Sequence, residues 1–189
     1  PAMITIDIAD FCRRAVDDAR QRYGKSLDIE YHTDAPMAFV CVDVVGMQSV
    51  LDELIVFAAD NHNADMPISV NVSSAEGKTS IGICIPGMII AKADMPFVFN
   101  RYFHVTGSKQ QAGGNTLAII HEYAEHNSGH AMVESDDNDT IVNIAFATVQ
   151  TSTAHNAFVS DTTVATQTPD IDSADARLLA KITETVEAH

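Results

Sequence analysis

The sequence lacks tryptophan, has few basic side chains and contains only three cysteines among its 189 residues. It carries 26 Asp and Glu against 11 Lys and Arg, which gives a formal net charge of −15. A surface this acidic repels phosphate backbones and anionic lipid headgroups, so this region is not expected to bind nucleic acid or an anionic membrane. No apolar run approaches the roughly 18 residues that a membrane-spanning helix needs, and the N-terminus has no secretory signal pattern.

The three cysteines, Cys12, Cys41 and Cys84, are far apart, odd in number and set among apolar residues. We therefore expect small buried hydrophobic side chains in a reduced, cytoplasmic protein. Apolar residues make up 46% of the chain, which is enough for one domain with its own core. Pro1 and Ala2 ahead of Met3 are typical of an expression remnant, so the chain is expected to be a piece of something longer.

Hydrophobic periodicity predicts helices that alternate with pairs of strands. The predicted helices cover 7–22, 44–61 and 115–127, and the predicted strands cover 27–31, 38–42, 68–72, 81–85, 131–134 and 141–147. Glu76-Gly77 is expected to form the turn of one hairpin. This order indicates an α/β sandwich, with one mixed, mostly antiparallel sheet and helices packed on one face.

The composition changes after Val149. Residues 150–172 are rich in Thr, Ser and Ala and poor in large apolar side chains, which predicts a linker or a loosely packed extension. Apolar residues then return at helical spacing, which predicts a terminal helix over 173–189. This helix is expected either to pack back on the domain or to begin a further module.

Five segments occur in an order that carries a resemblance to a known family: 50–58, 85–90, 99–103, 114–119 and 126–130. They lie where the ATP-binding catalytic domains of sensor histidine kinases, which have the Bergerat or GHKL fold, carry four conserved boxes and a His-Gly-Gly turn. The segment 99–103, Phe-Asn-Arg-Tyr-Phe, matches the F box closely. Residues 4–149 therefore resemble a histidine-kinase ATPase-like domain.

The resemblance implies a site for Mg-ATP, but several of its anchors are replaced. Phe57 stands where the family has the asparagine that holds Mg²⁺, and a phenyl ring cannot ligate a hard cation. Ile85 stands where the family has the aspartate that accepts a hydrogen bond from adenine. Ile89 and Thr116 replace glycines that let the backbone approach the phosphates.

The remaining residues at the implied nucleotide cleft are Gly87, Lys109, Gly113, Gly114 and Asn115. Each lost hydrogen bond to a ligand costs about 1–3 kcal/mol. Losing the adenine acceptor and a metal ligand together predicts at least a roughly hundredfold loss of affinity. We therefore expect a degenerate domain with no bound cofactor. ATP and Mg²⁺ are expected only if the alternative holds, an active kinase domain that binds ATP through non-standard contacts.

The phosphoacceptor histidine of the family lies on a helical hairpin ahead of the catalytic domain, whereas here no histidine precedes His32. The domain is accordingly expected to act in two-component signal transduction through a protein partner, either a dimerisation and His-bearing helix pair or a receiver domain. A third interpretation is a sensor for an apolar ligand, with a cleft lined by Phe57, Ile85 and Ile89.

No catalytic residue and no metal site is predicted. His121, His126 and His130 lack the spacing of a zinc site and are interpreted as surface or turn residues. Glu53 is expected on a solvated helix face or at the cleft rim, and the polar loop around Lys109 is expected to be an ordinary loop. The aromatic run 97–103 is expected to pack on the core.

Overall fold

The computed structural model describes residues 2–104 and 114–150, and the predicted linker and terminal helix lie outside them except for Gln150. The helices are α1 (Ile8–Tyr23), α2 (Val44–Asn61) and α3 (Thr116–His126), with two short 3-10 helices, η1 (Gly24–Ser26) and η2 (Met95–Phe97). The strands are β1 (Met3–Asp7), β2 (Ile29–Thr33), β3 (Phe39–Asp43), β4 (Ile68–Ala75), β5 (Lys78–Pro86), β6 (His130–Ser135) and β7 (Asp139–Ala147).

Helix α1 begins where the sequence predicts. The carboxylate of Asp7 accepts hydrogen bonds from the backbone N–H groups of Ala9 and Asp10, at 3.1 and 3.5 Å, which caps the helix. Its buried face carries Ile8, Cys12, Val16 and other small apolar residues. The burial of this stripe fixes which side of the helix faces the sheet.

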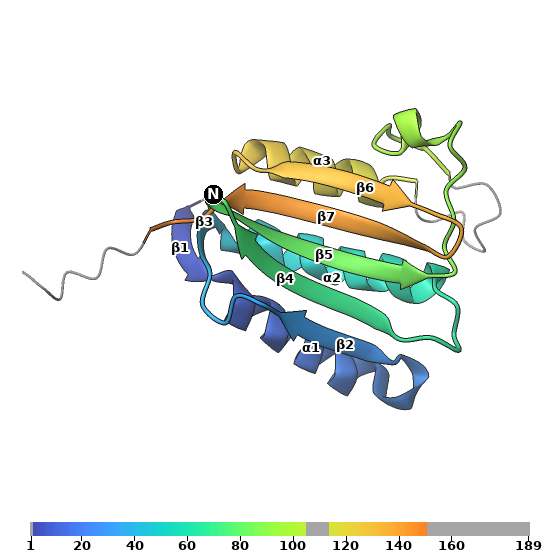
Figure 1. The fold of residues 1–189 in the computed structure, drawn as a ribbon, viewed down its shortest axis with the longest axis horizontal. Helices are drawn as coiled ribbons and strands as arrows, with labels where there is room; N and C mark the ends of the chain where they lie inside the picture. The colour runs from blue at the N-terminus through green and yellow to red at the C-terminus, as the bar shows by residue number, and fades with distance from the viewer. Residues whose placement is uncertain (1, 105–113, 151–189) are drawn as a thin grey trace, which may run out of the picture. The chain divides into compact units, whose positions relative to one another are not determined.

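A five-stranded sheet in the order β2-β4-β5-β7-β6 forms the centre of the domain. Strands β2 and β4 are parallel, and the other neighbours are antiparallel. The three helices cover one face of this sheet, as Figure 1 shows, and the opposite face, called here the open face, carries no helix of the described residues. The predicted α/β sandwich with a mixed, mostly antiparallel sheet is confirmed.

Alternation along the strands follows the two faces of the sheet. On β4 and β5, Val70, Ile83 and their like-facing neighbours are buried beneath the helices, whereas Ser69 and Cys84 lie on the open face. On α2, Leu51, Leu54 and Ala58 supply the facing apolar side chains. This burial holds α2 on the sheet.

The strand pairing differs from the predicted single sheet in one respect. Strand β1, absent from the prediction, pairs with β3 in a separate two-stranded antiparallel sheet, with Ile4 opposite Val42. The strand that precedes β3, β2, pairs in parallel with β4 instead, with Ile29 opposite Ile68. Alternating hydrophobicity identifies a strand but leaves its partner open, because pairing depends on residues distant in the sequence.

The expectation that all three cysteines are buried is wrong for two of them. Cys12 is buried, Cys84 is half-buried and Cys41 is exposed. Cys41 alternates on β3 with the buried Val40 and Val42, so its side chain emerges on the opposite side of the strand. Val40 and Val42, the neighbours of Cys41 in the sequence, therefore lie on the other face of β3.

This difference predicts an order of thiol reactivity. Burial, with a smaller contribution from Asp7, raises the pKa of Cys12 to about 12, and burial together with Asp139 raises the pKa of Cys84 to about 11. Because the thiolate is the reactive form, we expect iodoacetamide near neutral pH to alkylate Cys41 at least roughly tenfold faster than either. Time-resolved peptide mass spectrometry of the native protein measures this order, and labelling of Cys84 ahead of Cys41 would contradict it.

Candidate functional site

The residues of the predicted nucleotide cleft come from α2, from the end of β5 and from the N-terminus of α3. Phe57 lies on α2 with 6% of its side chain exposed, and Ile85 lies on β5 with none exposed. Both belong to the main hydrophobic core. The two positions that the resemblance assigns to metal and adenine are therefore occupied by core side chains.

Ile89 differs from this pair. Half of its side chain is exposed, at 50%, and it lies in the segment that follows β5. Ile89 lines a groove with Gly87 and residues of the open face, whereas Phe57 and Ile85 do not line that groove. The preceding residue, Met88, is the one that turns into the core.

The backbone conformation and the packing at Gly87 both require a residue without a side chain. Its φ is +78°, and a Cβ at this position would lie 2.8 Å from Cβ of Asn63. The Gly87 N–H donates to the carbonyl of Asn138 at 2.8 Å, and the Asn63 N–H donates to the carbonyl of Pro86 at 2.6 Å. The left-handed backbone and the close approach both favour glycine, with no ligand required.

The N-terminus of α3 carries the contact that the sequence analysis missed. The Thr116 hydroxyl, on a side chain only 5% exposed, donates to Oε1 of Glu53 on α2 at 3.0 Å. A carboxylate near a helix N-terminus is stabilised by the free N–H groups and the helix dipole, the same features that attract phosphate. Glu53 thus places a negative charge beside the position where the resemblance expects phosphate oxygens. In the sequence, the only signal for this contact was that Glu53 lies in the segment 50–58.

The turn ahead of α3 is held by hydrogen bonds from the backbone of Tyr102. The Tyr102 N–H donates to the carbonyl of Gly114 at 2.6 Å and to Oδ1 of Asn115 at 3.3 Å. A Cβ on Gly114 would lie 2.9 Å from Cε1 of the exposed His104 and 3.3 Å from Cα of Tyr102, so the two segments approach closely here. The other two predicted cleft residues, Lys109 and Gly113, lie outside the described residues.

The predicted core packing of the aromatic run holds for part of it. Phe99 and Phe103 pack against the core, while Phe97 and Tyr102 are exposed. The ring of Phe99 stacks on His121 of α3, with 4.6 Å between centroids. Arg101 donates through Nε and a terminal nitrogen to Oε1 of Glu122, at 3.0 and 2.6 Å. This segment is therefore attached to the outer side of α3.

The two helices that flank the predicted cleft are joined again at their other ends. Asn127, buried at the end of α3, accepts from the backbone N–H of Asp43 at 2.7 Å and donates to the carbonyl of Tyr123 at 2.9 Å. The Tyr123 hydroxyl donates to the carbonyl of Asp43 at 2.7 Å. Burial, with a smaller effect of the Asp43 carboxylate, raises the pKa of Tyr123. These hydrogen bonds fix the distance between the start of α2 and the end of α3.

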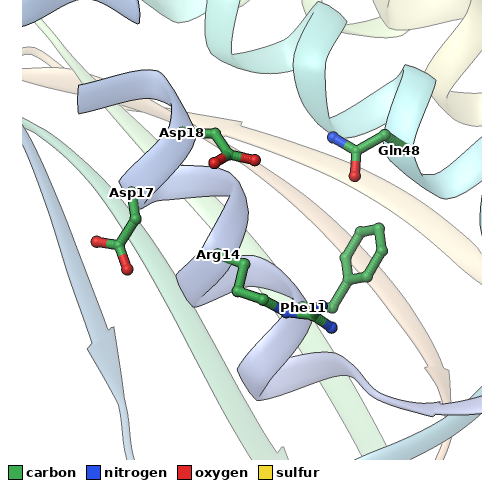
Figure 2. Close-up of a pocket in the computed structure, with 5 residues that line it drawn as sticks. All are labelled: Phe11, Arg14, Asp17, Asp18 and Gln48. Carbon is green, nitrogen blue, oxygen red and sulfur yellow. The ribbon is translucent and has the colours of Figure 1, made fainter. Parts of the chain in front are cut away.

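A small hollow of about 200 Å³ between α1 and α2 contains none of the predicted residues. Figure 2 shows Phe11, Arg14, Asp17 and Asp18 on α1, with Gln48 facing them from α2. Two of its charged groups pair within α1, because Arg14 pairs with Asp10 at 3.1 Å and Asp17 pairs with Arg13 and Arg20.

Within residues 2–104 and 114–150, no group of three or more His, Cys, Asp or Glu side chains is arranged to hold a metal ion. His121 and His130 both approach Oε1 of Glu125, at 3.9 and 3.6 Å, and Nδ1 of His126 lies 2.7 Å from the carbonyl of Glu122. No helix of the part that the structure describes combines the length and the hydropathy needed to cross a bilayer.

The fold, a mixed five-stranded sheet with three helices on one face, is similar to the fold of solved histidine-kinase catalytic domains. Similar solved structures include a nucleotide-free catalytic domain of the histidine kinase ThkA, with 15% identity, a TM-score of 0.67, and coverage of 78% of this chain and 96% of that chain. The ATP-binding domain of PrrB from Mycobacterium tuberculosis shares 20% identity at a TM-score of 0.62, covering 79% and 100%.

The histidine kinase domain of the E. coli osmosensor EnvZ gives a TM-score of 0.61 at 15% identity, with coverage of 80% of this chain and 92% of that chain. These similarities establish the fold. No protein-family model matches the chain, and no curated protein matches its sequence.

Proposed function

We propose that this chain is the ATPase-like domain of a two-component sensor protein and that it acts through protein contacts with little or no nucleotide binding. The observation that carries the proposal is the burial of Ile85 and Phe57 in the hydrophobic core. An isoleucine side chain offers no acceptor to an adenine amino group, and a phenyl ring offers no oxygen to Mg²⁺. The residues at these positions do not fit Mg-ATP.

Electrostatics support the same proposal. A triphosphate at the N-terminus of α3 would meet the carboxylate of Glu53, which already accepts the Thr116 hydroxyl. Like charges repel, so this carboxylate disfavours a triphosphate at the same helix end. The domain is thus better suited to a role in a phosphorelay as a partner-binding module, toward a His-bearing helix pair or a receiver domain.

Nucleotide binding provides the direct test. We expect isothermal titration of the purified chain with Mg-ATP or Mg-ADP to give no binding heat, and thermal unfolding at millimolar nucleotide to give no shift in Tm. A histidine kinase catalytic domain that binds ATP is the positive control under the same conditions. Micromolar affinity for either nucleotide would overturn the proposal.

One observation favours a second candidate, an active kinase domain with non-standard contacts. Glu53 is exposed and lies at the N-terminus of α3, where a carboxylate could take a proton from an attacking group. This candidate predicts ATP consumption with a phosphoramidate product on a histidine supplied by a partner. Absence of transfer to any cognate His-bearing helix would exclude it.

A further inference from the structure

A groove of about 560 Å³ lies on the open face, at the end of the sheet where β5 ends and β4 and β7 begin, to the right in Figure 1. Its floor is a row of residues across three strands, because Glu30 pairs with Ser69 and Ser69 pairs with Cys84. His32 extends the floor along β2, and its Nε2 lies 3.0 Å from Oε2 of Glu30. We call this the open-face groove.

Three loops form the wall of the open-face groove. They are the turn after α2, the segment after β5 and the turn between β6 and β7. The hydrogen bonds from Asn63 to Pro86 and from Gly87 to Asn138 tie these loops together. The carboxylate of Asp136 accepts from the N–H groups of Asn138 and Asp139, which lowers the pKa of Asp136 and fixes the third loop. The groove is therefore preorganised by backbone contacts.

The lining combines exposed apolar side chains with acidic ones. Met66 and Ile89 are 51% and 50% exposed. Glu30, Asp137 and Asp139 are the carboxylates, and none of the described residues that line the groove is Lys or Arg, so His32 beside Glu30 is the one basic side chain among them. Large apolar side chains exposed beside an excess of negative charge mark a surface suited to a partner of the opposite sign.

We infer that the open-face groove docks a segment of a partner protein in which basic side chains alternate with large apolar ones. The apolar side chains contact Met66 and Ile89, and Arg or Lys pairs with Glu30 and Asp137. The volume lies within the range of about 300–1,000 Å³ typical of binding pockets. Since the groove lies on the face opposite α2 and α3, this inference goes beyond the proposed function and does not depend on whether nucleotide binds.

The test uses the full chain and a fluorescein-labelled peptide of alternating Arg and Leu, measured by fluorescence anisotropy. We expect saturable binding that weakens as salt is raised, because screening shortens the reach of the exposed charges. Glu30→Gln with Asp137→Asn should weaken binding about tenfold, since each exposed pair contributes a factor of roughly two to five. Ile89→Ser should weaken it by a similar factor, about tenfold, through lost apolar contact.

Matched controls separate docking from general charge effects. Asp18→Asn removes an exposed carboxylate on α1, and Ile119→Ser removes a similarly exposed isoleucine on α3; both should leave the affinity unchanged. Glu30→Lys with Asp137→Lys should transfer binding from the Arg-Leu peptide to a Glu-Leu peptide. Equal losses in control and groove variants, no saturable binding, or failure of this reversal would overturn the inference. Circular dichroism of each variant confirms that it is folded.

Discussion

Replacing Ile85 with aspartate is expected to destabilise the domain by at least about 4 kcal/mol and not to restore an adenine site. The Ile85 side chain has no exposed surface and belongs to the main core, so the variant loses buried apolar area and forces a carboxyl group into it. Such a group raises its own pKa and stays protonated, or the strand end opens. Urea unfolding and titration with Mg-ATP measure the two outcomes on one sample.

The control for this variant is Ile119→Asp, at a side chain that is 44% exposed on α3. We expect this substitution to change the free energy of unfolding by less than about 0.5 kcal/mol, as is usual for surface positions. A folded Ile85→Asp variant that gains nucleotide binding would mean that the β5 end opens into a cleft readily. In that case the prediction that core packing keeps adenine out of this position would be wrong.

Asn127→Ala is expected to cost about 2–3 kcal/mol, because it leaves the backbone N–H of Asp43 and the carbonyl of Tyr123 without the amide that serves both. Asn127 is buried, so water cannot take over these contacts at full strength. The bond from the Tyr123 hydroxyl to the Asp43 carbonyl then remains as the hydrogen bond between the start of α2 and the end of α3. Thermal and urea denaturation measure the cost.

Asn100→Ala provides the matched control for Asn127, since Asn100 is exposed and its substitution removes the same amide from the surface. Its effect should stay below about 0.5 kcal/mol. Equal stability of the two variants would contradict the assigned role of Asn127. A smaller loss in Tyr123→Phe than in Asn127→Ala is also expected, because that change removes only the bond from the hydroxyl to the Asp43 carbonyl.

The sequence was sufficient to predict the helices and the sandwich, because each helix buries a periodic apolar stripe and each strand alternates. The boundaries of α2 were predicted to the residue, at Val44–Asn61. The partners of β2 and β3 could not be predicted, since the register of a strand depends on distant residues, and the five-residue β1 carries too short a pattern. Cys41 illustrates the same limit, because a neighbour in sequence occupies the other face of a strand.

The candidate site could be predicted only in outline. Phe57 and Ile85 were identified as replacements, but the burial that makes them core residues depends on tertiary packing. The different place of Ile89 could not be read from its position between Met88 and Ile90, which are both buried. The Thr116–Glu53 hydrogen bond joins residues 63 positions apart, and no local pattern signals such a contact.

Among the strands of the described residues, β2 pairs with β4 alone and therefore lies at an edge of the sheet. Edge elements open locally at a lower free energy than strands held on both sides, and β2 should therefore exchange its amide hydrogens sooner than β4 or β5. Because Glu30 and His32 belong to β2, the floor of the open-face groove exists only while this edge is closed. A ligand bound in the groove would accordingly slow the local opening of β2, which the sheet holds on one side only.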